Sequence, residues 1–266
     1  MRCMAPSTIL TTASALLAGA LLAGCAAPSN SGPGWTAQPG APSSPATAAA
    51  SPEASASASA TPGASGTATA QAAATAGAWK TFSDPEKTVS FELPETWIAQ
   101  SVPPEEGALP GALKVEVKKP DGTFMAALRT GLPPSSADCP EAARRAYTVI
   151  SSVPVGLSAE GGEGTIPPRA VFRVIQGYRY FGSYGITNVV GGADGQACEL
   201  RNIVRGPAGK GDYSFGDLVS LRAFATDEKV APAKAFDTLG QAARYVRESS
   251  DFANVQRMLM SLEIKN

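Results

Sequence analysis

The chain has 266 residues and almost balanced charge, with 22 Lys and Arg, 23 Asp and Glu, and a formal net charge of −1. This balance argues against a nucleic-acid-binding protein, which would carry a basic excess. The chain contains no His, which excludes a Ser-His-Asp triad, a Cys-His pair and a His-ligated metal ion.

The first 25 residues have the pattern of an export signal. Arg2 is their only charged residue, and an apolar run follows from Ile9 to Ala23. This run is shorter than the about 20 residues that a membrane-spanning helix needs, and it is typical of a secretory signal peptide. It ends in Leu22-Ala23-Gly24-Cys25, which resembles the lipobox of bacterial lipoproteins.

The lipobox resemblance implies that the chain is cleaved before Cys25 and that the Cys25 sulfur carries a diacylglyceryl thioether with palmitate-type chains. We therefore expect a signal peptide at 1–24 and a lipid anchor at Cys25. The anchor would hold the protein in the cell envelope, on the outer face of the cytoplasmic membrane. An uncleaved signal anchor or simple secretion is the alternative.

The segment 25–78 has the composition of a disordered tether. Ala, Ser, Pro, Thr and Gly supply nearly all of it, and Glu53 is its only charged residue. Because it has no period of large apolar side chains, it cannot offset the entropy that a chain loses on folding. We interpret it as a spacer that follows the lipidated cysteine and precedes a folded domain at 79–266.

The first half of this domain has the pattern of antiparallel strands. Val89, Phe91 and Leu93 alternate with other residues, and the alternating stretch 113–118 is followed by turn residues at 120–122. Alternation predicts half-buried strands, and the turn predicts a hairpin. The expected strands are 79–82, 89–93, 113–118 and 124–128.

A helix is predicted next, followed by a loop. Asp138 can cap the helix, Pro140 lies in its first turn and Glu141 occupies the capping-box position. The apolar stripe of this helix consists of Ala143, Tyr147 and Ile150. The Gly- and Pro-rich segment 156–168 is expected to be the loop.

The second half predicts four more strands and two helices. The strands are expected at 169–176, 178–190, 198–205 and 218–225, with a turn at 191–195. Thr238 and Gln241 form a capping box for the first helix, and Ser250 can cap the second. The fold class is therefore α+β, with an antiparallel sheet of about seven strands flanked by helices.

Two segments of the domain resemble PsbP-like domains. One is Phe82-Ser83-Asp84-Pro85 with the stretch from Val89 to Trp97, and the other is Tyr245-Val246 with Met258 to Leu262. Actinobacterial lipoproteins of the LpqN type carry such a domain behind a lipobox and a similar tether. The resemblance covers 79–266 and implies an α/β/α sandwich with helices on both faces of the sheet. Family members of understood role mostly bind other proteins and share no catalytic residues.

The four cysteines are expected to yield one disulfide. Cys3 leaves with the signal peptide and Cys25 is lipidated, which leaves Cys139 and Cys198 in an oxidising compartment. We predict that these two are joined. A redox-active pair is the alternative, although the pair lacks the C-x-x-C spacing of such sites.

Local patterns that approach enzymatic motifs do not match them. The loop Gly206–Asp212 has too few residues between its glycines for a phosphate-binding loop, and Gly182–Gly185 lacks the spacing of a nucleophile elbow. We therefore expect no catalytic residue, no cofactor and no metal. Paired carboxylates can still hydrolyse glycosides without His. The candidates in or near predicted loops are Glu160, Glu163, Asp212 and Asp217.

A row of tyrosines is the strongest local candidate for a binding patch. Tyr178, Tyr180 and Tyr184 fall on one face of the predicted strand 178–190, and Arg179 lies beside them. Exposed tyrosines with Arg would suit a protein partner or a glycan. The alternative is that they pack beneath a helix, because aromatic residues favour strands.

These features favour a non-enzymatic binding or interaction module that is tethered to the membrane. Its partner is expected to be a protein or an envelope component and not nucleic acid. The first alternative is a carrier of lipids or other hydrophobic ligands, which would need an apolar cavity between sheet and helices. The second is a His-independent cell-wall hydrolase that uses paired carboxylates.

Overall fold

The structure of the protein is a computed structural model that describes residues 73–134, 138–192, 194–228 and 234–265. All of them belong to the same unit of the chain, Ala56–Asn266. The predicted signal peptide at 1–24, the lipidation site Cys25 and the linker as far as residue 72 lie outside the described residues. No helix within these described ranges has the length and apolar character that crossing a bilayer requires.

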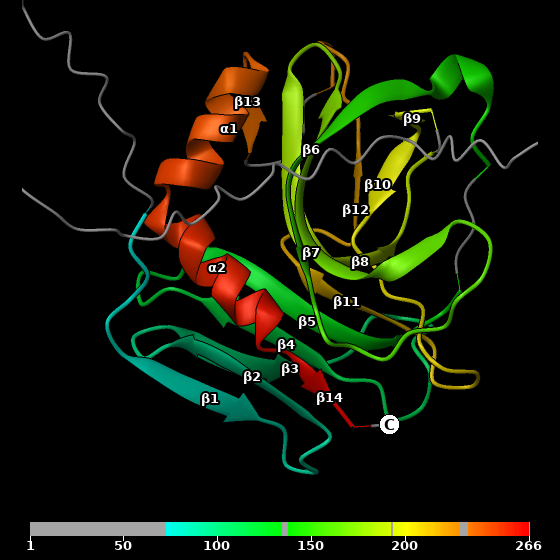
Figure 1. Ribbon diagram of the computed structural model, residues 1–266. Helices are drawn as coiled ribbons and strands as arrows, with labels where there is room; N and C mark the ends of the chain where they lie inside the picture. Colours follow the sequence, from blue (N-terminus) through cyan, green and yellow to red (C-terminus); the bar gives the residue numbers. More distant parts are fainter. Residues whose placement is uncertain (1–72, 135–137, 193, 229–233, 266) are drawn as a thin grey trace, which may run out of the picture. The chain divides into compact units, whose positions relative to one another are not determined.

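Strands make up most of the regular secondary structure (Figure 1). Its residues form fourteen strands, two α-helices and a short 3-10 turn, η1 (Glu141–Ala143). The strands are β1 (Trp79–Ser83), β2 (Val89–Pro94), β3 (Ile98–Val102), β4 (Lys114–Lys118), β5 (Phe124–Leu132), β6 (Arg145–Pro154), β7 (Thr165–Gln176), β8 (Tyr180–Val189), β9 (Gln196–Ala197), β10 (Glu199–Arg201), β11 (Asp212–Gly216), β12 (Ser220–Arg222), β13 (Ala235–Phe236) and β14 (Glu263–Ile264).

A nine-stranded antiparallel sheet is the main element of the fold. Its order is β3-β4-β5-β11-β8-β7-β6-β9, and β13 also pairs with β8. A smaller sheet has the order β1-β2-β14, and β10 pairs with β12 as a two-stranded ribbon. The predicted α+β class and the predicted β4–β5 hairpin are confirmed. The large sheet has nine strands rather than about seven, because segments expected to be helix or loop also pair into it.

Strand β6 stands where a helix is expected from the sequence. The capping signals at Asp138, Pro140 and Glu141 produce only η1, and the chain then pairs with β7 between Arg169 and Ile175. The β-branched residues Val149 and Ile150 favour this extended pairing. The helix prediction is therefore wrong, because apolar spacing within a segment does not reveal its partner strand.

The loop prediction for 156–168 fails at its end, where β7 begins at Thr165. Pro167 and Pro168 lie inside β7 but at an irregularity, since the pairing with β8 shifts register between Thr165 and Arg169. Proline has no N–H to donate to the ladder, so within a strand it is tolerated only where the regular pairing is interrupted, as it is here.

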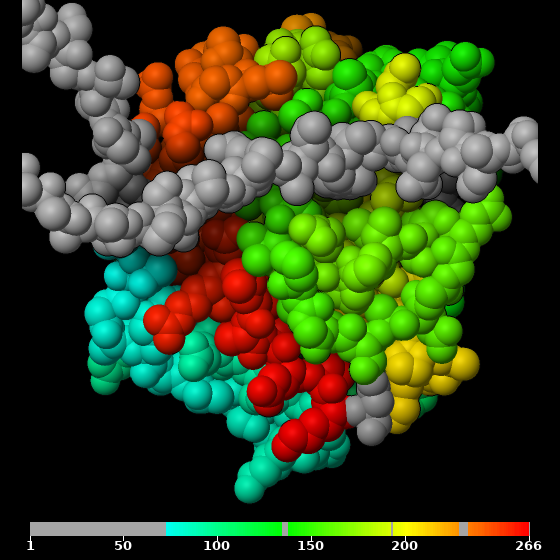
Figure 2. Space-filling view, in the orientation of Figure 1, coloured from blue at the N-terminus to red at the C-terminus, as the bar shows by residue number. Residues whose placement is uncertain are grey.

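The two helices are α1 (Leu239–Glu248) and α2 (Ser250–Met260). Thr238 caps α1 and accepts a hydrogen bond from the Gln241 backbone N–H, as predicted. Ser249 rather than Ser250 caps α2, and its Oγ accepts from the Phe252 N–H at 3.2 Å. Figure 2 shows α2 at the surface between the β1–β2 hairpin and strands β6 and β7.

Both helices cover the same face of the large sheet. Ala242 of α1 and Phe252 of α2 join Phe172 and Tyr184 in the main core. The opposite face carries a second core beneath the β10–β12 ribbon, made of Ile175, Phe181, Ala197, Leu200 and Leu221. The expected helices on both faces are therefore not found among the described residues, because the middle helix is replaced by β6.

Contacts with the fold begin at Ala73, ahead of the expected domain start at Trp79. The Ala73 N–H donates to the Arg247 carbonyl at 3.0 Å, and the Ala76 N–H donates to Asn254 Oδ1 at 2.7 Å. The Trp79 indole N–H in turn donates to the Ala76 carbonyl at 2.8 Å. The N-terminal part of the described chain thus joins the fold along α1 and α2.

Candidate functional site

The four residues of the predicted tyrosine patch do not share one surface. Tyr184 is only 1% exposed, its hydroxyl donates to the Met125 carbonyl at 2.6 Å, and Lys234 Nζ lies 4.3 Å from its ring centroid. Burial raises the pKa of Tyr184 well above its ordinary value. As part of a surface patch this prediction is wrong, because its face of β8 packs against the helices.

Tyr180 and Arg179 contact β13 and the residue that follows it. Tyr180 is half-buried and pairs with Phe236 across the β8–β13 ladder. Arg179 Nε lies 2.9 Å from Asp237 Oδ1 in an ion pair. Tyr178 differs from both, because it lies before β8, which begins at Tyr180. The alternation of side chains between the two faces of the strand therefore does not include Tyr178. With 47% of its surface exposed, Tyr178 remains the candidate from this row.

An open groove of about 560 Å³ lies beside Tyr178, and we call it the Tyr178 groove. Four parts of the chain form it: the end of η1 with the start of β6, the turn before β8, the start of β10, and the end of β12 with the segment that follows it. Its lining residues are Ala143, Arg145, Gly177, Tyr178, Cys198, Glu199, Arg222, Ala223, Phe224, Ala225 and Glu228. The predicted Cys139–Cys198 disulfide is formed, with the two Cα atoms 5.6 Å apart, and it joins the segment before η1 to the start of β10.

Phe224 lines the Tyr178 groove and the buried Phe181 packs against it, and we call these two rings the floor of the groove. The buried Phe181 ring lies edge-to-face between Tyr178, at a centroid distance of 5.2 Å, and Phe224, at 5.1 Å. Gly177 allows this approach, since a Cβ at that position would meet the Phe224 carbonyl oxygen at 2.5 Å. The Tyr178 N–H donates to that same oxygen at 3.3 Å. The exposed Tyr178 ring is therefore held in place before any ligand arrives, which lowers the entropy lost on binding.

Arg222 and Glu228 form a charged rim above this floor. Arg222 Nη1 donates to Glu228 Oε1 at 3.0 Å, and Nη2 donates to the other carboxylate oxygen. The guanidinium carbon also lies 4.4 Å from the Phe224 ring centroid. The hydrogen bond from Arg222, followed by that from the Ala225 N–H, lowers the pKa of Glu228 to about 2. Glu228 therefore stays ionised near neutral pH and cannot act there as a proton donor.

Arg145 and Glu199 complete the rim. Arg145 Nη1 donates to the carbonyl oxygens of Ala142 at 2.9 Å and Arg144 at 2.7 Å. Arg145 forms no ion pair with any residue that the structure describes. Glu199 accepts a hydrogen bond from Ser220 and lies opposite Arg222 in the ribbon. The groove thus offers an aromatic platform with both donors and acceptors around it.

The carboxylates that the sequence suggests for hydrolysis do not gather in a site. None of Glu160, Glu163, Asp212 and Asp217 lines the Tyr178 groove or either of two smaller clefts, of about 290 Å³ and 180 Å³, in the described part of the chain. Glu160 and Glu163 are exposed on the segment before β7, and Asp212 is buried at the start of β11, where burial raises its pKa. Asp217 is engaged by Ser183, Tyr184 and Lys234 inside the fold.

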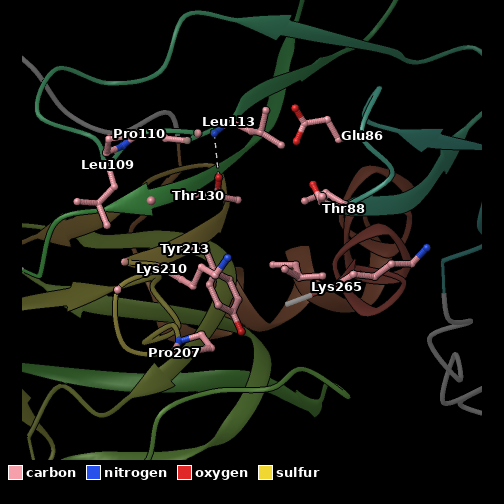
Figure 3. Close-up of a pocket in the computed structure, with 17 residues that line it drawn as sticks. Glu86, Thr88, Leu109, Pro110, Leu113, Thr130, Pro207, Lys210, Tyr213 and Lys265 are labelled. Atoms are coloured by element: carbon pink, nitrogen blue, oxygen red, sulfur yellow. Dashed lines mark hydrogen bonds between the residues drawn. The ribbon is translucent and has the colours of Figure 1, made fainter.

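The Gly-rich loop 206–212 lines a different cleft, of about 290 Å³ (Figure 3). Two of its polar side chains already have partners within the fold: Thr130 Oγ1 accepts from the Leu113 N–H at 2.8 Å, and the Tyr213 hydroxyl donates to the Ser158 carbonyl. Figure 3 shows the Lys265 side chain extending away from the cleft. This cleft is therefore a weaker candidate than the Tyr178 groove, and its loop holds no phosphate-binding pattern.

Residues 73–134, 138–192, 194–228 and 234–265 contain no group of three or more Cys, Asp and Glu side chains placed to hold a metal ion. Comparison of the chain with protein-family models, with curated proteins and with solved structures finds no match. Function must therefore be inferred from the geometry of the chain itself.

Proposed function

We propose that this protein is a lipid-anchored binding module of the bacterial cell envelope, and that it holds its ligand in the Tyr178 groove. The observation that carries this proposal is the exposed Tyr178 ring, fixed on a buried aromatic floor and surrounded by the charged side chains of Arg145, Glu199 and Arg222. Binding sites combine such an apolar platform with a few placed polar groups. The Leu22-Ala23-Gly24-Cys25 segment supports the lipid anchor and the location on the outer face of the cytoplasmic membrane.

A distant relation to PsbP-like domains belongs to the same proposal. The segment that carries the resemblance forms the β1–β2 hairpin and supplies Phe91, Leu93 and Trp97 to the main core. The replacement of the middle helix by β6 is a departure from that pattern. The relation favours a non-enzymatic role, because family members mostly act by binding other proteins.

The two alternative functions receive less support from the geometry. A lipid carrier would need an apolar cavity between sheet and helices, but Phe172, Phe252 and Met258 are buried there in one packed core. None of the three clefts is lined by residues of α1 or α2. A hydrolase would need two carboxylates in one site. The Tyr178 groove has Glu199 and Glu228, but Arg222 occupies both oxygens of Glu228.

The anchor is tested by replacing Cys25 in a bacterial host that processes lipoproteins. The unaltered chain is expected in the membrane fraction, and mass spectrometry of its N-terminal peptide should show a diacylglyceryl group on Cys25. Cys25→Ser should lose both the modification and the membrane association, whereas Cys3→Ser should keep them. Membrane association of the Cys25→Ser chain equal to that of the unaltered chain would contradict the lipid anchor.

The binding site is tested by placing a photo-crosslinking phenylalanine analogue at Tyr178 in cells. A defined adduct is expected from position 178, and Phe224→Ala should reduce it by removing part of the floor. The matched control places the same analogue at Phe124, which is 41% exposed on β5 and lines none of the three clefts. Equal adducts at both positions, or none at 178, would count against the groove as the binding site.

A further inference from the structure

Cys198 and Glu199 line two clefts, of which the Tyr178 groove is one. The second is smaller, about 180 Å³, and Arg201 and Arg205 also line it. We call this second cleft the arginine cleft. The two clefts therefore form neighbouring parts of one surface and share the Cys198–Glu199 segment.

This joint surface is positively charged, although the chain as a whole has a net charge of −1. The two clefts together are lined by four arginines and two glutamates, for a formal charge of +2. Glu228 pairs with Arg222, and Glu199 lies 3.9 Å from Arg201. Arg145 and Arg205, one in each cleft, form no ion pair with any described residue. An extended ligand with acidic groups could pair with both.

The aromatic platform adds a second requirement to the ligand. The Tyr178 ring lies at the surface over the Phe181–Phe224 floor, so it offers a flat face or edge rather than a deep pocket. A sugar ring presents an apolar C–H face that can lie on such a ring, and its hydroxyls can both donate to and accept from a charged rim. An acyl chain lacks groups that could replace the water around Arg145 and Glu199, and leaving such groups unpaired is unfavourable.

We infer that the Tyr178 groove and the arginine cleft together bind an acidic polysaccharide, a polyhydroxylated chain that carries carboxylate groups. The inference rests on the proposed function and specifies its ligand. Tyr178 stacks on one sugar ring, while Arg145 and Arg205 pair with carboxylates along the chain, since the guanidinium fork matches carboxylate geometry. Glu199 accepts from hydroxyls between these two points.

The inference is tested by calorimetric titration of the purified full chain with oligogalacturonate, a soluble chain of carboxylated sugars. Binding is expected at low salt and should weaken as salt rises, because exposed ion pairs are screened. Tyr178→Ala, and the pair Arg145→Ala with Arg205→Ala, should each weaken binding at least about tenfold. Arg244→Ala and Phe124→Ala are the matched controls, because both residues are exposed and lie outside the two clefts, and they should leave binding unchanged.

Two further ligands test separately whether the acidic groups and the sugar rings of the ligand are needed for binding. Neutral dextran should bind at least about tenfold more weakly than oligogalacturonate if Arg145 and Arg205 contribute as argued. Polyglutamate, an acidic peptide chain without sugar rings, should bind weakly and should not respond to Tyr178→Ala. Equal binding of dextran would overturn the acidic part of the inference, and polyglutamate binding that equals that of oligogalacturonate would overturn the saccharide part.

Failure of this inference is distinguishable from failure of the proposed function. If oligogalacturonate does not bind while the crosslinker at position 178 still forms its specific adduct, the ligand class is wrong and the binding module stands. If both are absent, the groove is not a binding site. Circular dichroism spectra of the variants should match that of the unaltered chain, and a double variant that fails this check is replaced by Arg145→Gln alone, with an expected weakening in the same direction.

Discussion

At the scale of single residues, Asp217 connects three parts of the chain inside the fold. Its Oδ1 accepts from Ser183 Oγ and, at 3.0 Å, from the Tyr184 N–H, while its Oδ2 lies 2.8 Å from Lys234 Nζ. Burial raises the pKa of Asp217 and is the largest effect, and Lys234 acts in the opposite direction. Asp217 thereby joins the end of β11 to β8 and to the residue before β13.

Replacing Asp217 should destabilise the protein strongly. Asp217→Ala leaves the Lys234 ammonium, the Ser183 hydroxyl and the Tyr184 N–H without their acceptor in a mostly buried place. Breaking a buried pair in this way costs about 3–5 kcal/mol. Urea unfolding measures the effect, and Glu106→Ala at an exposed position should change stability by less than about 0.5 kcal/mol.

The conservative change separates the roles of charge and hydrogen bonding at this position. Asp217→Asn keeps an oxygen for Ser183 and Tyr184 but removes the charge opposite Lys234, so its loss of stability should lie between those of the unaltered chain and Asp217→Ala. If Asp217→Ala unfolds at the same urea concentration as Glu106→Ala, this carboxylate does not hold the three segments together.

The lowered pKa of Glu228 predicts that the Arg222–Glu228 pair in the rim of the groove depends on pH. Its pKa is lowered from 4.5 to about 2, first by the hydrogen bond from Arg222. For a carboxyl group with a lowered folded-state pKa, the stabilisation is present above the unfolded value and is lost as pH falls toward the folded value. The Arg222–Glu228 pair should therefore stay intact down to about pH 4 and break as pH approaches 2.

Carboxyl carbon NMR shifts would follow this titration residue by residue. In the unaltered chain Glu228 should titrate with a midpoint near 2, and in Arg222→Gln the midpoint should move back toward 4.5. Arg244→Gln, on the exposed surface of α1, should leave the midpoint of Glu228 where it is. If Glu228 has the same titration midpoint in the unaltered chain and in Arg222→Gln, the hydrogen bond from Arg222 is not the cause of the lowered pKa.

At the scale of elements, the sequence predicts segments best where local pattern and tertiary partner agree. Strand β2 alternates cleanly and both C-terminal helices have caps and apolar faces, and all three elements form, with only the cap of α2 one residue earlier than expected. Strand β6 has helical spacing and capping signals, yet pairing with β7 prevails. Strand β11 alternates Tyr213 and Phe215 with polar or small residues, but it has only five residues and follows a Gly-rich loop, so the pattern is too short to identify it.

The candidate site was less accessible to sequence reasoning than the fold. The sequence identifies Tyr178, but only as part of a row of tyrosines on one strand face. In the structure Tyr184 lies in the core, Tyr180 pairs with β13, and Tyr178 alone lines the groove. Arg145, Glu199, Arg222 and Phe224 come from distant segments with no common motif, and pairing of the ribbon and of β6 with β9 brings them together. The alternation of Arg222 and Phe224 near the end of a predicted strand is a weak signal, because any strand at a surface shows it.

The disulfide links two distant elements, and its removal should lower the stability of the whole fold. Cys139 and Cys198 are 59 positions apart, and closing a loop of this length contributes about 4 kcal/mol in the chain-entropy model. The double variant Cys139→Ser with Cys198→Ser should therefore unfold at a lower urea concentration, by up to about that amount.

The pairing itself is checked by peptide mass spectrometry of an unreduced digest. The peptides that contain Cys139 and Cys198 should appear joined, and reductant should separate them. Adding reductant should also lower the stability of the unaltered chain and leave that of the double Ser variant unchanged. Detection of both peptides as free thiols in the unreduced digest would contradict the bridge.

At the scale of the whole folded unit, the N-terminal segment and the Tyr178 groove belong to opposite faces of the large sheet. Ala73 and Ala76 contact α1 and α2, which share the main core. The groove is built over the second core, through Phe181 and Phe224. With the proposed anchor at Cys25, this arrangement leaves the groove on the side of the sheet away from the tether's attachment.

The attachment also predicts where the chain can be shortened without loss of stability. A chain that begins at Ala73 keeps the hydrogen bonds from Ala73 to Arg247 and from Ala76 to Asn254. A chain that begins at Trp79 loses both, and it leaves the Trp79 indole N–H and the Asn254 side chain, which is 8% exposed, without these partners. Unpaired groups of this kind cost about 1–3 kcal/mol.

The shorter chain should therefore unfold at a lower urea concentration than the chain from Ala73, which should match the full chain. Asn254→Ala in the longer chain isolates one of these contacts and should reproduce part of the loss. Asn254→Ala should cause a smaller further loss of stability in the chain from Trp79 than in the chain from Ala73. The reason is that the chain from Trp79 already lacks Ala76, so the truncation and the substitution remove the same hydrogen bond. Equal stability of the two chains would place the start of the cooperative fold at Trp79 and leave the contacts of Ala73 and Ala76 without energetic weight.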